Sequence, residues 1–126
     1  MRIALKRREV GDIVARSPQA KRAALFAVSE NALSDSTKRV PKLHGHLRTS
    51  GRAFLSADGK GVIEWGGDSL TARYARAQHA GGTSRVRFRS YTTPGTGADW
   101  TGKTSAERAD AWRRMFAAVY GRGLRG

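Results

Sequence analysis

A first long helical pattern runs over residues 17–38. Ser17 and Pro18 favour a helix start, because a serine side chain caps free amides and a proline at the first helical position needs no hydrogen bond of its own. The apolar residues that follow recur at helical spacing in an alanine-rich stripe that includes Ala24, Leu25, Val28 and Ala32. Such a narrow stripe buries little area but lets another backbone come close. We therefore expect this helix to pack across a sheet or against a neighbouring subunit.

The pattern changes from helix to strand between Val40 and Leu47. Pro41 disfavours a helical backbone at the residue before it, and Gly45 supplies a backbone that can turn with positive φ. From Leu47 onward the side chains favour alternation, which predicts a strand. Gly51 within that strand indicates either a bend or a close neighbour. The segment therefore connects the first helix to a sheet.

A β-hairpin is the clearest prediction in the middle of the chain. The strand over residues 47–57 is followed by the turn residues Asp58 and Gly59, and a second strand is predicted over residues 62–65. Residues 69–78 fit either a third strand or a short helix. The alternation of their apolar residues favours the strand.

A strongly cationic strand is predicted from Ser84, because its arginines alternate with Val86 and Phe88. There is no carboxylate between Asp68 and Asp99, so the positive field of this window is not neutralised locally. The window holds five arginines: Arg73, Arg76, Arg85, Arg87 and Arg89. They form either a surface that faces DNA or an acidic partner, or an ordinary solvated face, and both interpretations stay open.

The last element is predicted to be a helix. Thr104 and Glu107 form a capping box, in which Thr104 caps the first turn and Glu107 reaches back to its amide. The apolar residues that follow recur at helical spacing: Ala109, Trp112, Phe116 and Val119. Gly121 is placed to end the helix.

These elements predict one α+β domain, in which a long N-terminal helix and a C-terminal helix pack on a small, mostly antiparallel sheet with a β-hairpin. Residues 1–16 are expected to form an extended arm, where Ile3 and Leu5 alternate as in a short edge strand. Residues 17–121 form the core and residues 122–126 a flexible tail. In a chain of 126 residues the core is modest, so aromatic side chains should carry much of the burial. They are Phe26, Phe54, Trp65, Phe88, Trp100, Trp112 and Phe116.

Charge narrows the range of partners. The chain has 24 Lys and Arg against 10 Asp and Glu, a formal net charge of +14, so nucleic acid or acidic protein surfaces are the expected neighbours. It has no cysteine, which excludes disulfides and thiolate metal sites. No apolar run approaches the ~20 residues that span a bilayer, so we expect no membrane partner.

Catalytic and cofactor chemistry find little support in the sequence. His44 and His46 would share a face of a strand, and His79 is a conceivable third metal ligand, but no carboxylate stands in an evident supporting position. The acids are not paired as glycosidases require, and no phosphate-binding or dinucleotide motif occurs. We therefore expect no metal, no cofactor and no catalytic residue, and interpret these histidines as turn or interface residues.

Three blocks of the sequence match motifs of one known protein family. The first is a helix end, a turn and the start of a strand: Val40, Pro41, Gly45, Leu47, Arg48 and Ser50. The second is similar to that family's Y-A-x-x-Q-x-x-G strand end: Tyr74, Ala75, Gln78, His79 and Gly81. The third is the aromatic and proline run from Phe88 to Trp100 before the last helix. Through these blocks the chain resembles the minor capsid or neck proteins of long-tailed double-stranded DNA bacteriophages.

The resemblance implies a structural virion protein of the neck, found in the host cytoplasm only during assembly. It implies a homo-oligomeric ring of six- or twelve-fold symmetry around the DNA channel, next to head-closure and tail proteins. The arginines would then face genomic DNA or acidic neighbours. The alternative is a small basic nucleic-acid-binding protein, although no helix-turn-helix, RRM, KH or zinc-finger signature is visible. A basic nuclease with His44 or His46 as general base is a third and weaker alternative.

Overall fold

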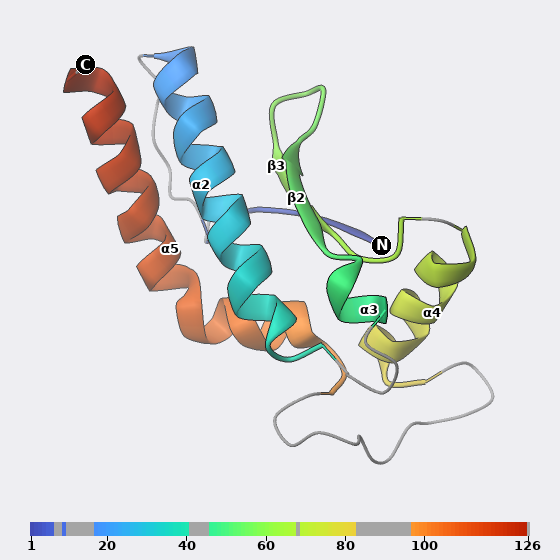
Figure 1. Cartoon of the computed structure of the whole chain (residues 1–126). Coiled ribbons are helices and arrows are strands. Elements are labelled where there is room, and N and C mark those ends of the chain that lie inside the picture. The colour runs from blue at the N-terminus through green and yellow to red at the C-terminus, as the bar shows by residue number, and fades with distance from the viewer. Residues whose placement is uncertain (7–8, 10–16, 41–45, 68, 83–96, 126) are drawn as a thin grey trace.

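The computed structural model of the chain describes residues 1–6, 9, 17–40, 46–67, 69–82 and 97–125. It confirms the α+β class. The elements in chain order are β1 (Arg2–Ala4), α2 (Pro18–Thr37), α3 (His46–Thr49), β2 (Arg52–Leu55), β3 (Gly61–Glu64), α4 (Ser69–Ala80) and α5 (Trp100–Arg125). Figure 1 shows α5, α2 and the β2–β3 hairpin side by side, with α3 and α4 gathered at the end of the sheet away from the hairpin turn. Among the described residues, no helix combines the length and apolarity needed to cross a membrane.

Helix α2 is the central element and begins where the sequence predicts. The Ser17 side chain accepts a hydrogen bond from the Ala20 amide (3.2 Å), and Pro18 occupies the first turn. The alanine-rich stripe is buried and lies between α5 and the sheet. A Cβ atom at Gly123 of α5 would come within 2.8 Å of the Ala20 Cβ atom. Small residues therefore let the two helix backbones approach closely, as the stripe predicted.

The sheet is antiparallel, with strand order β1-β3-β2. The hairpin prediction is confirmed: Gly59 has a φ of 82°, and the Ser56 amide donates to the Lys60 carbonyl oxygen (2.9 Å). The short strand predicted near Ile3 is confirmed as β1, which pairs Ile3 with Ile63 at one edge of the sheet.

The strand predicted over residues 47–57 is wrong at its start, where the chain forms the short helix α3. The Ser50 hydroxyl donates to the Leu47 carbonyl oxygen (2.7 Å) and the Gly51 amide to that of Arg48 (3.3 Å). These local bonds compete with strand pairing. The strand β2 begins only after this turn, at Arg52.

The strand favoured for residues 69–78 is also wrong, because this segment is the helix α4. Ala75 is fully buried while Arg73 and Arg76 are exposed, which is the burial pattern of a helix face. The apparent alternation covers too few residues to distinguish a strand from an alanine-rich helix.

Helix α5 is longer at both ends than predicted. It begins at Trp100 because Asp99 caps it: the Gly102 amide donates to Asp99 Oδ1 (3.3 Å). Thr104 therefore lies inside the helix, where its hydroxyl donates to the Trp100 carbonyl oxygen (2.6 Å), and the predicted capping box does not form. The helix also continues past Gly121 to Arg125, so the expected tail is helical up to that residue.

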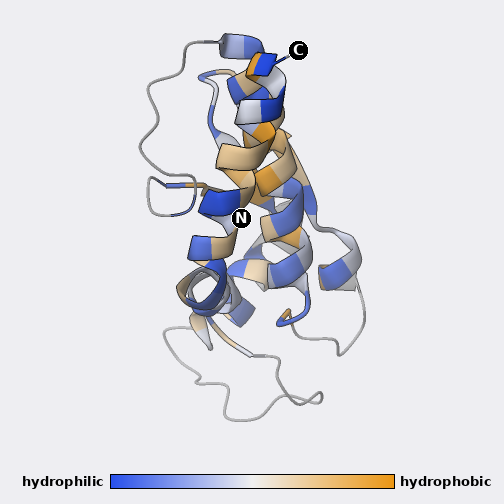
Figure 2. Cartoon of the chain, turned by 90° about the vertical axis from the view of Figure 1, so that its left-hand side faces the viewer, coloured by the Kyte–Doolittle hydropathy of each residue, from blue (hydrophilic) through white to orange (hydrophobic). Residues whose placement is uncertain are grey.

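All but two of the aromatic residues whose burial the structure describes are buried in the core. Trp65 and Trp100 are fully buried and meet edge to face, with ring centroids 5.7 Å apart. Phe26 was expected as a core anchor, but 47% of its surface is exposed on α2. Phe54 is only partly buried, and Phe88 lies outside the described residues. Figure 2 shows the resulting mixture of hydrophobic and hydrophilic faces on the two long helices.

Candidate assembly surface

Arg48, the charged residue of the first motif, binds the carboxyl end of α2. Its Nε atom donates to the Val40 carbonyl oxygen (2.9 Å) and its Nη2 atom to that of Lys38 (2.8 Å). Carbonyl groups at the end of a helix lack intrahelical donors and carry a partial negative charge, which a guanidinium group stabilises. Arg48 is therefore a helix cap that is supplied from another element.

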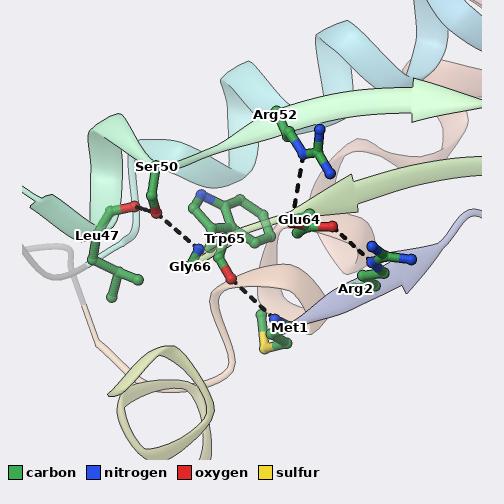
Figure 3. Close-up of polar contacts among 8 residues, drawn as sticks. All are labelled: Met1, Arg2, Leu47, Ser50, Arg52, Glu64, Trp65 and Gly66. Atoms are coloured by element: carbon green, nitrogen blue, oxygen red, sulfur yellow. Dashed lines mark hydrogen bonds and ion pairs between the residues drawn. The ribbon is translucent and has the colours of Figure 1, made fainter. Parts of the chain in front are cut away.

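Ser50 and Leu47 of the same motif join α3 to the end of β3 (Figure 3). Leu47 is buried, and the Ser50 hydroxyl, which donates to its carbonyl oxygen, also accepts a hydrogen bond from the Gly66 amide (2.9 Å). A Cβ atom at Gly51 would come within 2.9 Å of Trp65 Nε1, so the close neighbour expected there is this indole. The first motif thus forms a structural junction. Pro41 and Gly45 lie outside the described residues.

The second motif forms the end of α4 and not a strand end. Gly81 has a φ of 78°, its amide donates to the Gln78 carbonyl oxygen (3.2 Å), and the Gly82 amide donates to that of Ala77 (2.9 Å). This is the Schellman pattern that ends many helices, and it requires the left-handed conformation glycine adopts most easily. Ala75 of the motif belongs to α4 itself, and its side chain is fully buried. The side chain of Tyr74 lies outside what the structure describes.

His79 joins α4 to the start of α5. Its Nε2 atom lies 2.7 Å from the Thr101 hydroxyl, and its ring meets Trp100 edge to face at 4.7 Å between centroids. Burial lowers the pKa of His79, and the nearby carboxylate of Asp99 opposes this effect only in part. Burial therefore favours the neutral form of the ring, and its contacts with Thr101 and Trp100 join α4 to α5. No group of three or more metal-binding side chains occurs among the described residues; His44 and the side chain of His46 are not among them.

A buried carboxylate with two arginines lies on the sheet face opposite α2 (Figure 3). Glu64 of β3 stands between Arg2 and Arg52 in the strand register, with N–O distances of 2.7 Å and 3.4 Å. The carboxylate is 4% exposed, whereas the arginine side chains are 67% and 61% exposed. Phe54 lies under both guanidinium groups, whose carbon atoms are 5.4 Å and 4.8 Å from its ring centroid. We call these four residues the Glu64 clamp.

The two arginines also determine the ionisation of Glu64. Burial is the largest single influence and raises the pKa, but the hydrogen bonds and charges of Arg52 and Arg2 together outweigh it, so the pKa of Glu64 is lowered. The clamp therefore holds an ionised carboxylate beneath two exposed guanidinium groups and a partly buried aromatic ring.

An open polar hollow of about 570 Å³ lies between the carboxyl end of α2 and the first half of α5. Asp35 accepts hydrogen bonds here from Trp112 Nε1 (2.8 Å) and Arg108 Nε (3.1 Å). Arg39 pairs with Glu107 across the same gap. The charges of the hollow are paired with one another, so they hold the helices together and leave no evident ligand group.

Of the five arginines predicted to form a cationic surface, the structure describes two. Arg73 and Arg76 are both exposed, and their spacing of three residues places them on one face of α4. Arg85, Arg87 and Arg89 lie outside the described residues. The described part of this prediction is thus a small helical basic face.

A comparison with protein-family models matches residues 2–119 to a family described as minor capsid protein. The chain belongs to the minor capsid protein family. Comparisons with curated proteins and with solved structures returned no match. Membership in this family gives the chain a structural role in the phage virion. The Arg48 cap, the Glu64 clamp and the Asp35 network, which all stabilise the fold, agree with that role.

Sequence reasoning missed three features of this minor capsid protein. The Glu64 clamp was missed because its three charged residues meet only through strand register. Alternation within β3 places Glu64 opposite the core face, and that was the available signal. The Asp35 network joins residues that are 73 and 77 positions apart, and the cap made by Arg48 depends on how α3 folds back onto the end of α2, so no local pattern indicates either.

Proposed function

We propose that this minor capsid protein is a structural part of the phage neck, where copies form a ring around the DNA channel at the head-to-tail junction. The family match over residues 2–119 carries the proposal. Copies joined head to tail close into a ring when their rotation allows it, and the proposed six- or twelve-fold symmetry is what the resemblance to phage neck proteins implies. Adjacent head-closure and tail proteins are the proposed neighbours, and the role is structural and not catalytic.

Incomplete surfaces of the single chain support an assembled state. Within the described residues, β2 has a neighbouring strand on one side only. Phe26 is 47% exposed on α2, the helix that packs against β2. A free strand edge and an exposed aromatic side chain are features that protein interfaces use, since the edge can pair with another chain and the ring supplies buried area.

Electron cryo-microscopy of intact particles tests the location. We expect density for this chain in a collar below one capsid vertex, with cyclic symmetry around the channel. Density spread over the capsid shell, or a chain absent from the collar, would overturn the neck assignment while leaving the family membership intact.

A pair of variants tests the interface. Phe26→Ser should prevent incorporation into particles, because it removes the large aromatic side chain that α2 exposes. Leu124→Ser is the matched control: Leu124 is 46% exposed but lies at the end of α5, so incorporation should persist. Quantitative mass spectrometry of purified particles measures both, and equal incorporation of the two variants would exclude Phe26 from the interface.

A further inference from the structure

The amino end of α2 and the carboxyl end of α5 lie side by side (Figure 1). The two helices are antiparallel, since Ser17 approaches Tyr120 at one end and Asp35 approaches Arg108 at the other. The close contact of Gly123 with Ala20 brings the last turn of α5 against the first turn of α2. The start of α2 and the end of α5, which are distant in the sequence, therefore lie together at one end of the helix pair.

This surface is densely cationic. Its four charged residues are all exposed, and no described residue forms an ion pair with any of them. We call them the basic end: Lys21, Arg22, Arg122 and Arg125. Residues 17–29 and 111–125 contain no Asp or Glu. Neither of these two helix segments therefore carries a carboxylate that could neutralise the field of the basic end.

The helix dipoles modify this field without reversing it. The first turn of α2 contains no acidic residue, so its free amides add positive potential at the basic end. The carboxyl end of α5 contributes negative potential, which Arg122 and Arg125 in its last turn offset. The net result is a positive surface built from four side chains and one helix terminus.

The chemistry of this surface favours a phosphate backbone over an acidic protein. Cores of protein interfaces are depleted of lysine and enriched in large apolar side chains, whereas the one large apolar residue exposed in the described last turn of α5 is Leu124. In Figure 2 that end of the helix is mostly hydrophilic with a short hydrophobic stretch. Phosphates are bound by exposed Lys and Arg and by helix amino ends, without any need for a pocket.

We propose that the basic end binds the phosphate backbone of double-stranded nucleic acid without sequence specificity. Every residue involved belongs to a single chain, so this binding does not depend on the proposed ring. The free protein should bind a duplex even if the neck assignment fails, and a ring that binds no duplex would refute only this proposal.

Fluorescence anisotropy with a labelled 20-base-pair duplex, over a range of NaCl concentrations, tests the proposal. Each phosphate contact contributes about 0.9 to the slope of log affinity against log salt. The quadruple variant K21Q/R22Q/R122Q/R125Q should therefore lower the magnitude of the slope by about 2 to 4 and weaken binding at low salt. Glutamine has a helix propensity close to those of lysine and arginine, so both helices should persist.

The matched control removes the same net charge elsewhere on the surface. Its variant is K6Q/K60Q/K103Q/R114Q, at four residues that are also exposed. This control should change the slope by less than about 1. Equal effects of both quadruple variants would mean that total charge alone drives binding, and would overturn the proposal.

Two further measurements keep the result interpretable. If the quadruple variant does not fold, as judged by circular dichroism, the pairs K21Q/R22Q and R122Q/R125Q should each give about half of the slope change. Poly-glutamate of matched charge serves as the acidic-protein probe. Competition by it as strong as by unlabelled duplex would refute the phosphate assignment.

Discussion

The two ends of the α2–α5 pair differ in how their charges are balanced. At one end Asp35 is 14% exposed and accepts hydrogen bonds from Trp112 and Arg108, while Arg39 pairs with Glu107. At the other end the four cations of the basic end have no described partner. The same two helices thus use charge for cohesion at one end and leave it available to a partner at the other.

The difference has a simple energetic basis. A charge that is partly buried and hydrogen-bonded becomes part of the fold, because removing its partner leaves a desolvated group. An exposed charge contributes little to stability and stays solvated until a partner of opposite charge arrives. Substitutions at the paired end should therefore change stability, and substitutions at the basic end should change binding.

Trp112→Ala should have the largest effect. Trp112 is 2% exposed and its indole donates to Asp35, so truncation should lower the free energy of unfolding by ~3–5 kcal/mol. Urea denaturation measures this change. Trp112→Phe, which keeps most of the volume, should lose much less. A loss below about 1 kcal/mol for the alanine variant would mean that Trp112 is not a core residue of the free chain.

Asp35→Ala should have the next largest effect. It removes the acceptor for both Trp112 Nε1 and Arg108 Nε, so the free energy of unfolding should fall by about 1–3 kcal/mol. The same urea titration measures it. If the two side chains interact, the double variant Asp35→Ala/Trp112→Phe should lose less unfolding free energy than the sum of the two single losses. Losses that add up fully would contradict the described hydrogen bond.

Glu64 provides a third arrangement, a buried carboxylate beneath exposed arginines. Its pKa is lowered from the usual value of 4.5, so the stabilisation it contributes is fully present above that pH and is lost as the pH falls through the lower, folded-state value. Glu64→Gln should reduce the free energy of unfolding at pH 7 by about 1 kcal/mol. The variant should also lose less stability than the original protein as the pH falls. Thermal unfolding between pH 3 and pH 7 compares the two proteins; parallel curves would mean that Glu64 does not titrate differently on folding.

The Arg39–Glu107 pair should contribute less, because the Glu107 side chain is 61% exposed. A double-mutant cycle with Arg39→Gln and Glu107→Gln should give a coupling free energy of about 0.2–1 kcal/mol, which decreases with added salt. A coupling that salt does not change would indicate hydrogen bonding in place of an ion pair.

The quadruple variant of the basic end should have the smallest effect on stability. Its free energy of unfolding should stay within about 0.5 kcal/mol of the original, or rise slightly as like charges are removed. Chemical denaturation at low and high salt measures this. A marked destabilisation would mean that the charges of the basic end also stabilise the fold, so the two ends would not differ in this respect.

Local signals explain which elements the sequence predicted well. The start of α2 depends on Ser17 and Pro18, and the hairpin on Asp58 and Gly59, so adjacent residues sufficed. The start of α5 was missed because the cap residue Asp99 has a φ of 49° and its amide donates to the carbonyl oxygen of His79 (2.7 Å). That geometry depends on α4, whose helical nature the short alternating pattern had concealed.

The sequence by itself determined the α+β class, the alanine-rich central helix, the hairpin and the large excess of positive charge, because each follows from local spacing or from composition. Only the tertiary structure decided which charges are paired. Asp35 and Arg108 are 73 residues apart, and Arg2 and Glu64 are 62 apart, so their contacts exist only once the helices and strands have packed. Packing likewise brought the start of α2, which carries Lys21 and Arg22, against the end of α5, which carries Arg122 and Arg125, because two helices can approach closely where both have small residues at the contact.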